Sequence, residues 1–235
     1  MAVWWRTLFF PLLLLSLSCA YPSYAAPSGQ QRASPYRNFL TFTRSIRAHV
    51  QHLLRRYKEQ QLGDRHFEDR NLEMSSLPSL STNFLGWLQQ KDWERLTGAS
   101  RDLNTYWSQL DRKRKQMEME KERTMMSHGS KAASRNPPTL PQSFSRIQRE
   151  ISDLVNQVNF QLRFVKVSPV STTSPPKLTG SATPPASTAP PQQTLWLSRL
   201  EGYVILRDLE RYLVKLTRDF LLLASKQTGG SHSEG

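Results

Sequence analysis

Four segments of this sequence place apolar side chains at alternating steps of three and four, the spacing of one face of an α-helix. The last segment has the clearest pattern, a strict heptad stripe made of Leu206, Leu209, Leu213, Leu216, Phe220 and Leu223. Each stripe must be buried against another element. The sequence therefore predicts an all-α fold in which four helices share one core.

The expected helices cover residues 35–62, 92–126, 143–165 and 194–226. Gly63 and Asp64 end the first helix, because glycine commonly follows a helix end. The last helix has an alternative beginning at Ser198, since Ser198 and Glu201 match a capping box. Residues 83–88 are open to two interpretations, a short apolar helix or a packed loop.

The connections between these helices differ in length. Antiparallel neighbours need only about two to eight linking residues, whereas the first and third connections have about 20 and about 28. Such lengths permit two parallel pairs, the up-up-down-down topology of a long-chain four-helix bundle. The third connection, residues 166–193, holds seven prolines and ten serines or threonines, which predicts a disordered, extended linker that could carry O-glycans.

The N-terminal 25 residues have the order of a secretory signal peptide: a basic leader with Arg6, an apolar run over 8–17, and small residues before Ala20 and Ala25. We expect cleavage after Ala20 or Ala25. The run is shorter than the roughly 20 residues that span a bilayer, so we prefer this interpretation to an uncleaved anchor. The expected mature domain is 26–235, secreted and not inserted in a membrane, with a polar, disordered tail at 227–235.

Cys19 is the only cysteine, and either cleavage removes it. The mature protein would then have no disulfide, no cysteine nucleophile and no cysteine-ligated metal. Its fold would depend on the apolar core alone.

The formal net charge of +13 indicates acidic partners, such as heparin, an acidic receptor face or anionic lipid. Secretion argues against nucleic acid. Lys113, Arg114 and Lys115 could form a nucleic-acid or nuclear-import patch, but the surrounding residues 111–123, ten of thirteen charged, favour a solvated helix face.

The sequence contains no catalytic motif that we can identify, and we expect neither an enzyme nor a bound cofactor or metal. Among five histidines, only His49 and His52 share a helix face. Two ligands are too few for a structural zinc site, so we interpret them as a surface pair.

Residues 196–220 resemble the fourth helix of the interleukin-6 family, in the branch of leukaemia inhibitory factor, ciliary neurotrophic factor and cardiotrophin-like cytokine. Residues 94–97 and 103–110 add a weaker resemblance in the second helix. The resemblance implies a secreted cytokine that brings together glycoprotein-130-like and leukaemia-inhibitory-factor-receptor-like chains, sometimes with a third, non-signalling receptor. The alternative is a basic, secreted helical protein that binds heparin or membranes.

The resemblance also implies receptor-binding residues. This branch carries a Phe and a Lys three residues apart at the start of its last helix, where Trp196 and Arg199 stand here. They differ in identity but keep an aromatic ring and a cation, the types enriched at binding hot spots. The alternative is that Trp196 closes the end of the core. Lys215 and Asp219 match the surface for the non-signalling receptor, and could equally form a solvent-exposed ion pair.

Overall fold

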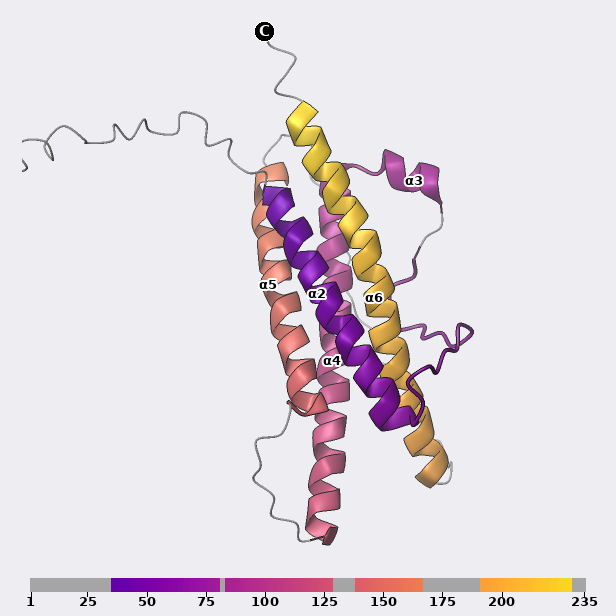
Figure 1. Ribbon diagram of the computed structural model, residues 1–235. Helices are drawn as coiled ribbons and strands as arrows, with labels where there is room; N and C mark the ends of the chain where they lie inside the picture. Colours follow the sequence, from indigo (N-terminus) through magenta and orange to yellow (C-terminus); the bar gives the residue numbers. More distant parts are fainter. Residues whose placement is uncertain (1–34, 81–82, 129–137, 167–190, 230–235) are drawn as a thin grey trace, which may run out of the picture. The chain divides into compact units, whose positions relative to one another are not determined.

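The computed structural model describes residues 35–80, 83–128, 138–166 and 191–229, and this part of the chain is all-α, without a strand (Figure 1). Its elements are α2 (Pro35–Tyr57), the π-helical η2 (Lys58–Leu62), α3 (Phe84–Gln89), α4 (Asp92–His128), α5 (Leu140–Lys166) and α6 (Pro191–Gly229). The four predicted long helices are confirmed. Of the two interpretations of residues 83–88, the short helix is correct.

Local chemistry explains several helix ends. η2 ends at Gly63, whose φ of 74° lies in the left-handed region that glycine adopts without steric cost. Asn83 caps α3, since its side-chain oxygen accepts a 3.0 Å hydrogen bond from the Gly86 amide. α6 begins at Pro191, a residue suited to the first helical position. The alternative beginning at Ser198 is therefore wrong, because Ser198 lies inside the helix.

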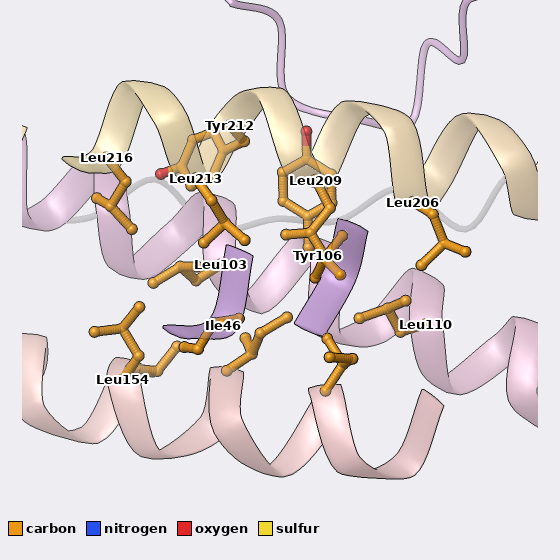
Figure 2. Close-up of a cluster of buried hydrophobic side chains, with 14 of the residues drawn as sticks. Ile46, Leu103, Tyr106, Leu110, Leu154, Leu206, Leu209, Tyr212, Leu213 and Leu216 are labelled. Atoms are coloured by element: carbon orange, nitrogen blue, oxygen red, sulfur yellow. The ribbon is translucent and has the colours of Figure 1, made fainter. Parts of the chain in front are cut away.

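The apolar stripes of α2, α4, α5 and α6 meet in one core (Figure 2). All six residues of the predicted stripe between Leu206 and Leu223 are at most 1% exposed. Ile46, Leu103 and Leu154 bring the other three helices into the same cluster (Figure 2). Removal of this apolar surface from water is the main force that holds the helices together.

α2 runs antiparallel to α6 (Figure 1). Tyr57, the last residue of α2, donates a 3.0 Å hydrogen bond to the carbonyl of Arg199, near the beginning of α6. Phe39, near the beginning of α2, contacts Phe220 near the end of α6, with ring centroids 5.3 Å apart.

The other three contacting pairs of long helices are also antiparallel. Between α2 and α5, His49 contacts Glu150 and Arg56 contacts Ser143. Between α4 and α5, Ser100 contacts Asn159 and Arg114 contacts Gln148. Between α4 and α6, Asp92 contacts Lys226 and Arg112 contacts Glu201. In each pair, early residues of one helix meet late residues of the other. α2 and α4 therefore point the same way, opposite to α5 and α6.

The helical spacing of apolar residues in α4 includes Trp93 and Trp107, which would predict that both are buried, but both are exposed. Trp93 is 43% exposed and Trp107 is 39% exposed. The interior positions belong instead to Ala99 and Tyr106, which alternate with the buried Leu103 at steps of four and three. Trp107 follows Tyr106 directly and therefore points about 100° away from it around the helix.

Several predictions lie wholly or partly outside the described residues. These are the signal peptide 1–25, most of the linker 166–193 and residues 230–235 of the tail. α5 extends to Lys166, α6 begins at Pro191 and α6 ends at Gly229, so the helices reach into both ends of the expected linker and into the expected tail. Among the described helices, none combines the length and apolar character needed to cross a membrane.

Candidate functional site

An apolar surface marks the first turns of α6. Leu195, Trp196 and Leu197 are consecutive and 38%, 42% and 56% exposed. Trp196 is neither a member of the buried core cluster nor one of the partly buried side chains packed against it. A large exposed aromatic ring beside two leucines is an available contact for another protein.

Arg199 lies one turn after Trp196 and is half-buried. Its Nε is buried without a hydrogen-bond partner among the described residues. Arg199 borders a surface hollow of about 450 Å³, whose other lining residues include Arg56, Gln60, Met117, Glu120 and Leu140. Arg199 therefore lines a hollow that it shares with the end of α2, η2, α4 and the beginning of α5.

The first turns of α6 are held by the buried cation of Lys113, which was predicted to lie on a solvated helix face. Lys113 is only 2% exposed, and its Nζ donates to the carbonyl of Ser198 at 2.5 Å and to its hydroxyl at 2.6 Å. Burial lowers the pKa of Lys113, although Glu201 and Glu120 act in the opposite direction. The solvated interpretation of Lys113 is wrong, because position 113 continues the interior stripe of α4.

Its neighbours behave as surface residues. Arg114 bonds to Asp111 and to Glu118, and Lys115 lies 2.7 Å from Asp111. The interior place of Lys113 follows a signal present in the sequence, three residues after Leu110 and four before Met117, which are both buried.

Close packing also fixes this end of α6. Gly202 lies against Tyr57 and Lys113, and a Cβ at residue 202 would lie 2.2 Å from the Tyr57 hydroxyl oxygen and 2.8 Å from Cε of Lys113. A side chain at residue 202 would therefore require Tyr57 and Lys113 to move. These contacts hold Ser198, Arg199 and Gly202 of α6 against α2 and α4.

The second predicted pair, Lys215 and Asp219, is divided between surface and interior. Lys215 Nζ lies 2.8 Å from Asp219 Oδ2, but the two side chains are 25% and 1% exposed. Asp219 Oδ1 accepts hydrogen bonds from Trp87 Nε1 at 2.6 Å and from Arg95 Nη1 at 2.8 Å. The expectation that Asp219 is a surface contact is corrected, since its carboxylate is enclosed. The alternative of a solvent-exposed pair is wrong for the same reason.

The carboxylate of Asp219 instead attaches α3 to α4 and α6. Arg95 Nη2 also donates to the Trp87 carbonyl at 2.6 Å, and its guanidinium lies 5.0 Å from the centre of the Trp87 ring. With Trp87 held, the other apolar side chains of this short helix face solvent: Phe84, Leu85 and Leu88 are 65%, 67% and 47% exposed. This apolar surface of α3, which lies near Lys215, was not predicted from the sequence.

These two surfaces belong to different ends of α6. Residues 196 and 215 are separated by about 28 Å at a rise of 1.5 Å per residue. Both surfaces combine exposed apolar side chains with a cation, and each is attached to the core by buried hydrogen bonds.

The histidines do not form a metal site within the described residues, where no group of three or more His, Cys, Asp or Glu side chains has a suitable arrangement. His49 is part of a contact between helices: its Nδ1 lies 3.0 Å from Glu150, and its Nε2 lies 2.9 Å from Arg146 Nη2. His52 is exposed. Of the two histidines predicted to form a surface pair, His49 therefore contacts α5 and His52 faces solvent.

The sequence matches no protein-family model, and its comparison with curated proteins gives no significant match.

Proposed function

We propose that this protein is a secreted cytokine of the interleukin-6 type, which binds glycoprotein-130-like and leukaemia-inhibitory-factor-receptor-like chains and thereby starts kinase signalling inside the cell. The proposal assigns it no chemistry of its own. Trp196 and Arg199 form one receptor contact, and a surface around Lys215 and α3 is offered to the non-signalling receptor.

The proposal includes an up-up-down-down bundle. It is supported by the antiparallel contacts of α2 and α4 with both α5 and α6, exemplified by Tyr57 with Arg199 and Asp92 with Lys226. Two parallel pairs of long helices need connections that travel the length of the helices. The long first and third connections of the sequence meet that need.

The observation that carries the proposal is the exposure of Trp196 at a helix beginning that Lys113, Tyr57 and Gly202 hold in place. An exposed indole on a rigid element binds at low entropic cost, because little side-chain or backbone freedom is lost. Arg199 adds a cation one turn away. Two such surfaces at separate places, one on α6 and one around Lys215 and α3, suit a ligand whose activity requires two receptor chains to come together.

The test is binding of the purified protein to immobilised ectodomains of the two receptors. Trp196→Ala should weaken binding to the leukaemia-inhibitory-factor receptor by about thirtyfold, the effect of losing a hot-spot side chain of about 2 kcal/mol. Trp107→Ala is the matched control, since Trp107 is an equally exposed tryptophan on α4. It should change the dissociation constant by less than about threefold.

Arg199→Ala should weaken the same contact without affecting glycoprotein-130. If both receptors bind and both variants behave as the wild type, the contact surface is misassigned although the family proposal stands. If neither receptor binds the wild type at physiological salt, the cytokine proposal fails.

A further inference from the structure

The charge of α2 is unusual among the helices of this protein. None of its 23 residues is an aspartate or glutamate, whereas it contains five arginines. Two of these make contacts with other elements: Arg47 Nε donates to Glu210 at 2.6 Å, and Arg56 donates to Ser143 and to the Pro138 carbonyl. The remaining arginines are Arg37, Arg44 and Arg55.

These three are exposed, and none has a carboxylate partner among the described residues. Arg37 and Arg44 are seven residues apart, about two helical turns, and Arg44 and Arg55 are eleven residues apart, about three turns. The three arginines therefore lie along one line on the outside of α2. The line is about 27 Å long from Arg37 to Arg55. Its exposed neighbours are small or polar: Asn38, Thr41, Ser45, Ala48 and His52.

The acidic side chains on adjacent elements do not neutralise this line. Glu210 is bonded to Arg47 and Gln51, Glu150 to His49 and Arg146, and Asp92 to Lys226. Glu59, one turn beyond Arg55, is the nearest acidic residue along the chain. The face therefore presents three arginines, each able to donate two parallel hydrogen bonds to an oxyanion.

We propose that the outer face of α2, made by Arg37, Arg44 and Arg55, binds a sulfated glycosaminoglycan chain along the helix axis. A linear polyanion suits a linear row of cations, and sulfate groups fit the guanidinium fork. Counterions released from the polyanion supply the affinity, as they do for other dense linear polyanions. This inference does not depend on the proposed receptor function.

Two other polyanionic surfaces fit this face less well. Membrane-surface helices insert a large apolar face, but the large apolar residues of α2 are buried or partly buried in the core. Single-stranded nucleic acid is held by stacking on exposed aromatic rings, and the exposed positions of α2 contain none. A sulfated polysaccharide needs neither feature.

The experiment measures binding of a size-defined heparin oligosaccharide to protein purified from cells that express the full chain. The variant R37Q/R44Q/R55Q should weaken binding at least about tenfold and reduce the slope of log Kd against log salt, because three ionic contacts are lost. The control R65Q/R101Q/R163Q removes the same charge from exposed arginines outside α2. It should weaken binding less than about threefold, through net charge alone.

The charge-conserving variant R37K/R44K/R55K should fall between the wild type and the glutamine variant, since lysine lacks the fork. Helical circular dichroism of each variant shows that the fold is retained. Equal losses in the two glutamine triples would overturn the proposal, because affinity would then follow net charge and not this face. Tighter binding to phosphatidylserine vesicles or to duplex DNA than to heparin would also overturn it.

Discussion

The carboxylate of Asp219 lies 2.8 Å from the guanidinium of Arg95, and both side chains are 1% exposed. This buried pair joins the end of α6 to the beginning of α4. Through Trp87 it also holds α3, so one charged contact positions three elements and the apolar surface that α3 exposes.

Replacement of Asp219 by alanine should lower the free energy of unfolding by about 3–5 kcal/mol, because it leaves the Arg95 cation buried without a counter-charge. Denaturant unfolding followed by circular dichroism measures this effect. The exposed pair of Lys226 with Asp92 is the control, and Lys226→Ala should cost less than about 1 kcal/mol. Similar losses in the two variants would contradict a special role for the buried pair.

Two glycines in helices should respond oppositely to alanine. At Gly202 the new Cβ would meet Tyr57 at 2.2 Å, so Gly202→Ala should destabilise the protein by about 1–3 kcal/mol. At Gly98 nothing lies within 4 Å of that position, and Gly98→Ala should stabilise by up to about 1 kcal/mol through helix propensity. Thermal melting of both variants checks the signs. A stabilising Gly202→Ala would show that α2 and α6 are less closely packed than described.

Alkaline pH should unfold the protein through its buried tyrosines. Burial raises the pKa of Tyr57, Tyr106 and Tyr212 in the folded state, with nearby carboxylates adding to the effect. The unfolded chain ionises these groups near the ordinary pKa of 10.0, so stability is lost as the pH rises above about 10. Tyrosinate absorbance and helical signal should change together. Ionisation of all tyrosines near pH 10 with the helices intact would contradict this prediction.

Asp111 should contribute stability at neutral pH that is absent in acid. Hydrogen bonds from Lys115 and Arg114 lower its pKa from 3.8 to about 2 in the folded state. A lowered pKa means that the contribution is complete above about pH 4 and is lost as the pH falls toward about 2. Asp111→Asn should therefore lower stability at pH 7 by up to about 1 kcal/mol, as expected for a partly solvated cluster.

Unfolding of this variant at pH 7 and again near pH 3 measures how the difference from the wild type shrinks in acid. Asp153→Asn removes an exposed carboxylate of α5 and serves as the control. A difference that stays constant with pH would mean that the Asp111 contacts do not depend on its charge.

The beginning of α6 shows how far the candidate site could be predicted. Trp196 and Arg199 are named because the last helix resembles that of the interleukin-6 family, in which an aromatic residue and a cation stand one turn apart. The support beneath them was not predictable in the same way. Tyr57, Lys113 and Gly202 come from three helices, and only packing brings them together.

The helices could be predicted from the sequence, because steps of three and four between apolar residues depend only on the geometry of one helix. The stripe from Leu206 to Leu223 is buried as its spacing predicts. The burial of charged residues depends on the packing of the helices, since a cation or carboxylate enters the core when another helix supplies its partners. Lys113 finds Ser198, and Asp219 finds Arg95 and Trp87, across distances in the sequence that no local pattern records.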